Sequence, residues 1–191
     1  MEMNKTLRSI AIVVAIILVI AMPIIGGYNK MVSLEQKVKV AEGNIDTQLQ
    51  RRSDLIPNLV ETVKGYASQE KDIFIKIAEA RAKLGGAQTV TDKAQADSEL
   101  GSALSRLLVV VERYPDLKSN ENFRDLTVAL EGTENRIAIA RQDYNKTVDN
   151  YNTTIKRFPN AIIAGIFRFE EKTYYKASES AKEVPKVNFS K

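Results

Sequence analysis

Residues 9–29 read SIAIVVAIILVIAMPIIGGYN and contain no charged side chain, whereas the chain that follows to residue 191 is polar. At about 1.5 Å rise per residue, a helix of this length spans about 31 Å, close to the hydrocarbon thickness of a bilayer. We therefore predict one transmembrane helix at 9–29, preceded by a short flank at 1–8. Everything after it would then be a single domain attached to the membrane.

The same segment has a second interpretation as a cleaved signal peptide, because Lys5 and Arg8 precede the apolar run. The apolar core of a signal peptide is usually about 7–15 residues long and ends in a small-x-small cleavage site. Here the run extends from Ile10 to Ile25, and Ile25 with Gly27 makes a poor cleavage site. We favour a retained anchor, which would make this a single-pass membrane protein.

Basic residues near the anchor indicate its orientation. Lys5 and Arg8 lie on the N-terminal side, and Lys30, Lys37 and Lys39 lie on the other side. Cytoplasmic loops carry an excess of Lys and Arg. The small excess after the anchor favours a cytoplasmic location for the large domain.

The composition lacks two residue types that enzymes commonly use for catalysis. The chain has no cysteine and no histidine, which excludes disulfides, thiol chemistry, the usual zinc sites and every imidazole base. The 28 basic and 24 acidic residues give a net charge of only +4, and the two signs alternate along the chain. We expect no enzyme activity, no cofactor and no nucleic-acid partner.

After the anchor, apolar residues recur every three or four positions, as on one face of a helix. The pattern predicts that the membrane helix continues into the next one and that a kink or short break occurs at Pro57. Short connections favour antiparallel neighbours. The fold class is all-α: one N-terminal transmembrane helix followed by an elongated antiparallel four-helix-type bundle at 30–159. The predicted helices are 30–53, 55–84, 92–113 and 120–158.

Helix ends are indicated by glycine and by capping residues. The pair at 85–86, Gly-Gly, closes the second predicted helix. Thr91 or Asp92 is the predicted N-cap of the third helix, and Ser119 or Asn120 that of the fourth.

The C-terminal tail at 160–191 contains an apolar patch, AIIAGIFRF at 161–169, and a final hook at Val187 and Phe189. The patch is too short to span a bilayer. It can contact lipid or a partner, but we favour packing on the end of the bundle, because an apolar patch on a monomer is usually covered.

Two long segments carry a specific pattern, QRRSDLIPNLVETVKGY at 50–66 and EGTENRIAIARQDYN at 131–145. Together with YPDL at 114–117 and VPKVNF at 184–189, they resemble the LemA family of bacterial membrane-anchored proteins. The resemblance implies a single-pass inner-membrane protein with its short N-terminus outside, an antiparallel helical bundle and no agreed biochemical activity. It also implies an adaptor role, in association with membrane proteases.

The chain departs from the family's pattern at three places. Glu42 stands where members often have tryptophan, Gln69 stands where histidine is common, and Arg168 replaces the usual glycine before phenylalanine. Any role that depends on those side chains in relatives cannot be performed in the same way here.

The two long segments supply the candidate residues for an interaction or for structure. They are Arg51, Arg52, Asp54, Pro57, Asn58, Glu131, Glu134, Asn135, Arg136, Arg141, Tyr144 and Asn145. Two neighbouring guanidiniums could bind phosphate or a lipid headgroup. We favour a structural role, in which Asp54 caps a helix and the arginines pair with Glu131 or Glu134 of a neighbouring helix. Tyr144 follows the core period and is expected to pack and hydrogen-bond between helices.

Two functions follow from these residues. The favoured one is a non-enzymatic scaffold or adaptor of the bacterial cell envelope, for a protein partner or for self-association. The alternative is a ligand- or metal-binding bundle that uses Arg51, Arg52 and the carboxylates Glu61, Glu70, Glu131 and Glu134. Dimetal bundles normally take histidine from Glu-x-x-His motifs, which this chain lacks.

Overall fold

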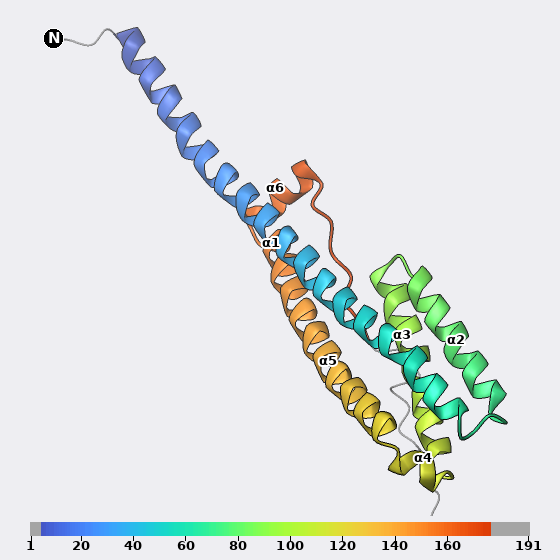
Figure 1. Cartoon of the computed structure of the whole chain (residues 1–191). Coiled ribbons are helices and arrows are strands. Elements are labelled where there is room, and N and C mark those ends of the chain that lie inside the picture. The colour runs from blue at the N-terminus through green and yellow to red at the C-terminus, as the bar shows by residue number, and fades with distance from the viewer. Residues whose placement is uncertain (1–4, 177–191) are drawn as a thin grey trace, which may run out of the picture. The chain divides into compact units, whose positions relative to one another are not determined.

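The computed structural model describes residues 5–176, and its regular elements are all helices (Figure 1). They are α1 (Lys5–Lys64), α2 (Lys71–Gly86), α3 (Val90–Val111), α4 (Pro115–Ser119), α5 (Glu121–Lys156) and α6 (Asn160–Phe167). The all-α prediction is confirmed. The expected hook at Val187 and Phe189 lies outside the described residues.

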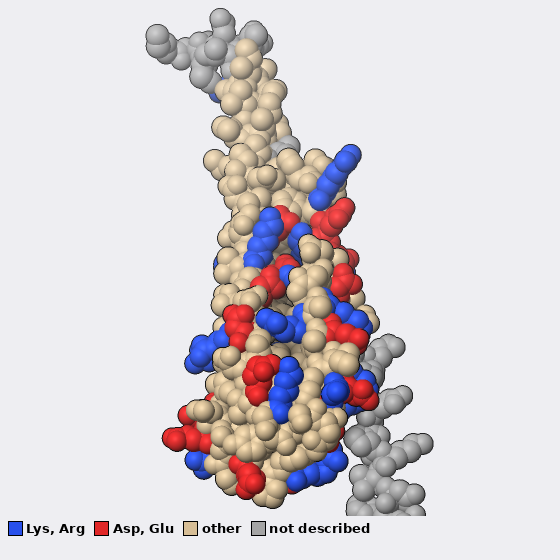
Figure 2. Space-filling view, turned by 45° about the vertical axis from the view of Figure 1, so that its right-hand side comes forward, with Lys and Arg blue, Asp and Glu red and all other residues tan. Residues whose placement is uncertain are grey.

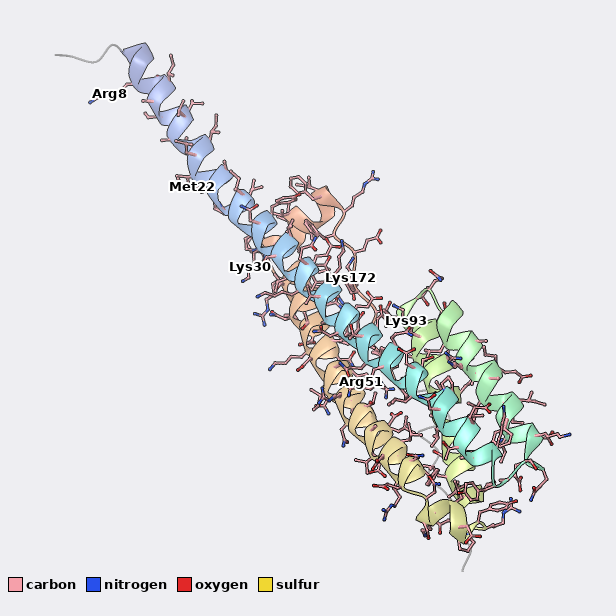
Figure 3. The ribbon with its side chains drawn as sticks, viewed as in Figure 1. Arg8, Met22, Lys30, Arg51, Lys93 and Lys172 are labelled. Carbon is pink, nitrogen blue, oxygen red and sulfur yellow. The ribbon has the colours of Figure 1, made fainter. Side chains whose placement is uncertain are left out.

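The N-terminal part of α1 is the candidate anchor. The described chain holds one helix that is long and apolar enough to cross a membrane, Arg8–Lys64, whose most apolar window has a mean hydropathy of 2.9 and is not buried. In Figure 3, Arg8 and Lys30 bracket the uncharged stretch in which Met22 lies. The expected continuation of this helix into the domain is confirmed, because α1 is uninterrupted through Gly26 and Gly27.

Of the two alternatives predicted at Pro57, a kink or a short break, the break does not occur, because α1 continues as a helix to Lys64. A proline inside a helix costs about 3 kcal/mol through its lost hydrogen bond and its steric clash. Ile56, Leu59 and Val63 are each at most 2% exposed on the same helix. Burying such side chains contributes about 1.5–3 kcal/mol each, which offsets the proline.

The interruption occurs instead between Lys64 and Lys71, within the predicted helix 55–84. Gly65, a weak helix former, follows the last residue of α1. Periodicity cannot locate this turn, because the buried Ala67 and Phe74 are seven positions apart and preserve the helical repeat across it. The second predicted helix therefore becomes the end of α1 plus α2, and α2 ends at Gly86.

The helix starts follow capping chemistry. The N-cap of α3 is Thr89, whose hydroxyl accepts a hydrogen bond from the backbone N–H of Asp92 at 3.1 Å. The prediction of Thr91 or Asp92 is thus wrong by two or three residues. At α5, the side-chain oxygen of Asn120 accepts from the N–H of Phe123 at 3.0 Å, and this cap was predicted.

The chain divides into two compact units, one of residues 1–40 and 146–172 and the other of residues 41–145 and 173–191. In the second unit, α2 lies beside α3 (Figure 1). Its core takes apolar side chains from α1 to α5. The most deeply buried of them are Ile56, Leu59, Val63, Ala67, Ile77, Leu100, Leu107 and Leu117.

In the first unit, α6 packs against α1 at Gly27 and Tyr28. The rings of Tyr28 and Phe167 have centroids 4.8 Å apart, and Ile163 and Ala164 are buried. The apolar patch at 161–169 is therefore partly covered by its own chain, although Ile162 and Ile166 stay exposed.

Candidate functional site

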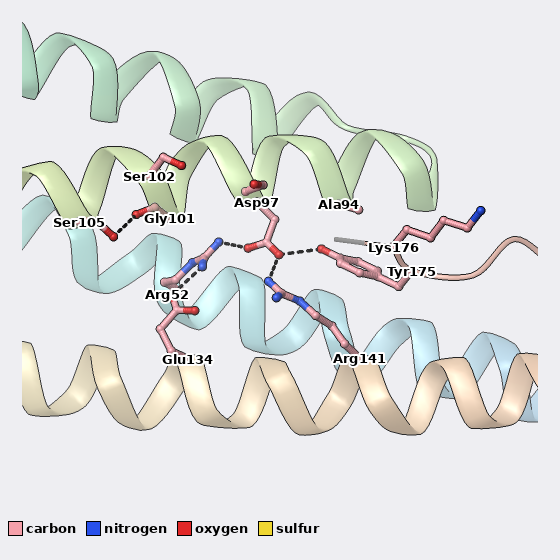
Figure 4. Close-up of a pocket in the computed structure, with 11 residues that line it drawn as sticks. Arg52, Ala94, Asp97, Gly101, Ser102, Ser105, Glu134, Arg141, Tyr175 and Lys176 are labelled. Atoms are coloured by element: carbon pink, nitrogen blue, oxygen red, sulfur yellow. Dashed lines mark hydrogen bonds and ion pairs between the residues drawn. The ribbon is translucent and has the colours of Figure 1, made fainter. Parts of the chain in front are cut away.

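A buried cluster of charged side chains lies in the second unit and joins three helices to the segment that follows α6 (Figure 4). We call it the ionic cluster. Its members are Arg52 from α1, Asp97 from α3, Glu134 and Arg141 from α5, and Tyr175 from the extended segment after α6.

Asp97 is the centre of the ionic cluster. Its Oδ1 accepts from Nη2 of Arg52, and its Oδ2 accepts from Nη2 of Arg141 and from the Tyr175 hydroxyl at 2.8 Å. The side chains of Asp97 and Arg52 are each only 1% exposed. Both carboxylate oxygens are therefore engaged by donors and shielded from water.

Arg52 extends the ionic cluster to a second carboxylate. Its Nη1 donates to Oε1 of Glu134 at 2.6 Å, and Glu134 is partly exposed. This is one of the two pairings that the sequence predicts for this arginine. Two guanidiniums and two carboxylates balance in charge, which is the condition for keeping such groups buried.

Burial also shifts two pKa values in the ionic cluster. It lowers the pKa of Arg141, although Tyr175 opposes this shift, and it raises the pKa of the Tyr175 hydroxyl. The guanidinium of Arg141 lies over the ring of Tyr175, 5.2 Å from its centroid. Tyr175 therefore keeps its proton at neutral pH and serves as a donor to Asp97.

A pocket of about 360 Å³ opens beside the ionic cluster. Ser102, Ser105 and Lys176 contribute to its lining together with the cluster residues. The Nε atoms of Arg52 and Arg141 are buried and have no hydrogen-bond partner among residues 5–176. The lining holds three basic side chains, Arg52, Arg141 and Lys176, and two acidic ones, Asp97 and Glu134, so its small excess of positive charge suits a small anion better than a cation.

Tyr144 and Asn145 fasten the extended segment to α5. The Tyr144 hydroxyl donates to the carbonyl of Thr173 at 2.8 Å. Asn145 makes two bonds to the backbone of Tyr175: its amide donates to the carbonyl at 2.9 Å, and its oxygen accepts from the N–H at 2.8 Å. The predicted polar role is present, but the partner is the segment after α6 and not another helix. Burial raises the pKa of Tyr144 to about 12.

Tyr151 and Asn152 repeat this arrangement seven residues later on α5, in the first unit. The Tyr151 hydroxyl donates to the carbonyl of Glu170 at 3.0 Å. Asn152 bonds both backbone groups of Lys172 at 2.9 Å. At both positions, the Tyr-Asn dipeptide of α5 therefore hydrogen-bonds the backbone of the segment that follows α6.

Other candidates from the sequence are not part of the ionic cluster. Arg51, Glu131, Asn135 and Arg136 are exposed, and their side chains make no hydrogen bond or ion pair with residues 5–176. Asp54 is not a helix cap, because α1 is continuous there; it accepts a hydrogen bond from Gln50 at 2.7 Å. Figure 2 shows side chains of both charge signs interspersed on the surface that it displays.

The carboxylates proposed for a metal site have separate partners. Glu61 pairs with Lys64, Glu70 with Arg113, and Glu134 with Arg52. Among residues 5–176 no three or more acidic, histidine or cysteine side chains are placed to hold a metal ion. The structure therefore does not bring these four glutamates together.

The three departures from the family's pattern have local roles. Oε1 of Glu42 forms an ion pair with Nζ of Lys93 at 3.1 Å. The side-chain amide of Gln69 donates a hydrogen bond to the hydroxyl of Tyr114 at 2.5 Å. Burial by itself lowers the pKa of Lys93, but hydrogen bonds to Asp46 and Glu42 outweigh it and raise the pKa. Arg168 ends α6 with φ 56°, the left-handed conformation that glycine adopts most readily.

Sequence reasoning missed Asp97 and Tyr175. Asp97 stands three positions before Leu100 and seven before Leu104, on the apolar stripe of α3, so a charge at a core position was the available signal. Tyr175 lies in a segment without periodicity, and nothing in the sequence pairs it with Asp97.

Comparison with known proteins agrees with this architecture. Residues 41–189 match the model of the LemA family. The chain is 27% identical over 177 residues to magnetosome protein MamQ 1 of Paramagnetospirillum magneticum, an alignment that covers 78% of this chain and 64% of the relative. It is 22% identical over 156 residues to Protein LemA of Metamycoplasma hominis, covering 81% of this chain and 71% of the relative. The chain thus spans less than two thirds of the length of the MamQ protein.

Proposed function

This chain belongs to the LemA family, and we propose that it is a membrane-anchored, non-enzymatic scaffold of the bacterial cell envelope whose helical surface binds a protein partner. The observation that carries the proposal is the burial and hydrogen bonding of Asp97. This buried carboxylate is fully engaged by Arg52, Arg141 and Tyr175. The buried charges of the ionic cluster therefore link α1, α3 and α5.

The ionic cluster supports a scaffold because catalysis and metal binding need accessible lone pairs. A general base must reach a substrate proton within about 2.6–3.2 Å. Asp97 is 1% exposed and already accepts from three donors. A rigid junction of α1, α3 and α5 is what such a group supplies.

The surface left for a partner runs along α1 and α5 in the second unit. We call it the α1–α5 seam and define it by the exposed polar residues that the fold does not use. They are Arg51 and Asn58 on α1 and Glu131, Asn135 and Arg136 on α5. Two shallow hollows adjoin it, one of about 550 Å³ lined by residues that include Asn58 and Leu126, and one of about 230 Å³ lined by residues that include Ala41 and Arg136. Exposed polar side chains beside hollows fit the rim of a protein interface.

The anchor supplies the location of the scaffold. The apolar half of α1 would hold the chain in the inner membrane, and the basic residues after it favour a cytoplasmic domain. A tethered surface meets membrane-bound partners at high effective concentration.

Position-specific crosslinking tests the proposal. A photoreactive amino acid would replace Asn58, Asn135 or, as a matched exposed control on α2, Ile75 in the full-length chain in bacterial cells. We expect discrete crosslinked products at Asn58 and Asn135, none at Ile75, and their loss when Arg136→Glu is added. A product at twice the 21.3 kDa chain mass would identify self-association. Identical products at all three positions, or none, would contradict the scaffold.

A second function is favoured by the pocket beside the ionic cluster. The three basic side chains of its lining, Arg52, Arg141 and Lys176, would suit a small anion in the 360 Å³ pocket. Inorganic phosphate should then raise the melting temperature of the full-length chain, and Ser102→Leu should abolish the shift. Elemental analysis of the same sample, with Glu131→Gln and Glu134→Gln, tests the metal alternative. Absence of both effects leaves the scaffold as the function.

A further inference from the structure

Helix α6 has one face packed on its own chain and one apolar face that no part of residues 5–176 covers. Ile163 and Ala164 are 4% and 6% exposed, whereas Ile162 is 58% and Ile166 is 67% exposed. Ile162 and Ile166 are four residues apart and share one side of the helix. Phe158, just before α6, is 83% exposed. Three large apolar side chains within nine residues are thus exposed to solvent.

The packed face fixes α6 to the end of the candidate span. A Cβ atom built on Gly27 would lie 2.7 Å from Cδ1 of Ile163 and 2.9 Å from Oδ1 of Asn160, so any larger residue here would require these two side chains to move. Tyr28 adds ring contacts with Phe167 and Phe169, at 4.8 and 5.7 Å between centroids. The contact point is two residues, about 3 Å of helix rise, beyond Ile25, where the apolar run ends.

The chemistry around α6 is that of a bilayer interface. All eight residues of Asn160–Phe167 are uncharged, and Arg157 and Arg168 flank them. Lys30 lies one turn beyond Gly27 on α1. Aromatic side chains and cations concentrate where the hydrocarbon meets the headgroups.

We propose that α6 is a second membrane contact, which lies in the headgroup region at the C-terminal end of the span and inserts Phe158, Ile162 and Ile166 into the lipid. This inference rests on the proposed anchoring of α1. Lipid is the occupant because α6 packs at Gly27 and Tyr28, directly after the apolar run, and its exposed side chains are apolar and flanked by arginines. An interfacial helix buries its apolar face by about 5–10 Å.

The absence of cysteine makes the test clean, because a single introduced cysteine is labelled uniquely. The full-length chain would be reconstituted in vesicles of phosphatidylethanolamine and phosphatidylglycerol with an environment-sensitive fluorophore at Ile162→Cys or Ile166→Cys. Val19→Cys in the span and Ile139→Cys on α5 are the reference positions, since both are exposed in the fold. Quenching by spin-labelled lipids measures contact with the bilayer.

The outcomes separate the two proposals. We expect quenching at 162 and 166 of at least about half that at 19, and none at 139, because an interfacial label lies near the acyl boundary. Quenching at 19 with none at 162 and 166 would overturn the contact of α6 and leave the anchor intact. No quenching at 19 would overturn the anchoring of α1 and, with it, the proposed membrane contact of α6. A blue shift at 162 that depends on protein concentration, without lipid quenching, would assign the face to a second copy and also overturn the proposal.

A matched pair of glycines tests the geometry. Gly27→Leu places a side chain against Ile163 and Asn160, whereas nothing lies within 4 Å of a Cβ atom built on Gly26. We expect Gly27→Leu to reduce the quenching at 166 by about half or more while the quenching at 19 is unchanged, because displacement of α6 withdraws its apolar face from the lipid. Gly26→Leu should leave both values unchanged. Equal effects of the two substitutions would contradict a helix held by Gly27.

Discussion

The hydroxyl of Tyr175 donates a hydrogen bond to Oδ2 of Asp97 at 2.8 Å, across 78 positions of sequence. This bond places the last described segment of the chain in the same network as Arg52 and Arg141. The hydrogen bonds of Asp97 are therefore complete only when that segment lies beside α5. A substitution in the segment should alter the ionic cluster, and a substitution in the ionic cluster should alter the segment.

Asp97→Asn should be the most damaging single substitution in the domain. An amide cannot neutralise the two guanidiniums, and breaking a buried ion pair costs about 3–5 kcal/mol. Asp72→Asn, at an exposed position in the first turn of α2, should change the free energy of unfolding by less than about 0.5 kcal/mol. Urea unfolding of the full-length chain in detergent, followed by circular dichroism, measures both. A loss below about 1 kcal/mol for Asp97→Asn would show that the ionic cluster is not structural.

Asn145→Leu should release the extended segment without unfolding α5. It removes both bonds to the backbone of Tyr175, each of which contributes about 0.5–1.5 kcal/mol. Hydrogen exchange should become faster at residues 173–176. The control is Gln142→Leu, an exposed position on the same helix, which should leave this exchange unchanged. Unaltered protection in Asn145→Leu would contradict the role assigned to this amide.

Stability should decline at alkaline pH through the buried tyrosines. The pKa of Tyr144 is raised to about 12 and that of Tyr175 is raised as well, from an unfolded value of 10.0. The folded state then binds more protons than the unfolded state between these values, so the contribution is complete below pH 10 and is lost as pH rises toward 12. Urea unfolding between pH 8 and 11.5 should show this decline. Tyr144→Phe should make it shallower, and an identical slope in the variant would refute the assignment.

Thr89→Ala should destabilise α3 through loss of its N-cap. Replacing such a cap costs about 0.5–2 kcal/mol, because the N–H of Asp92 loses its acceptor. Thr91→Ala is the matched control, since Thr91 is exposed and lies inside α3. Thermal unfolding should distinguish the two variants. Equal melting temperatures would show that the cap contributes nothing.

The sequence by itself determined the candidate membrane span, the all-helical class and several local features. An uncharged run of bilayer length, helical periodicity, the end of α2 within two residues of its predicted position and a cap at Ser119 or Asn120 all depend on short-range chemistry that a linear pattern displays. The sequence also limited the expected partners of Arg51 and Arg52 to Glu131 or Glu134, and the structure pairs Arg52 with Glu134.

Only the tertiary structure decided where α1 ends and what the buried charge does. Helical periodicity continues across residues 65–70, so the turn there is invisible to it, and packing of Ile56 and Leu59 carries the helix through Pro57. Asp97 acquires its role because folding brings Arg52, Arg141 and Tyr175 to it from distant positions. Long-range electrostatic pairing depends on distances in space, which periodicity along the chain does not encode.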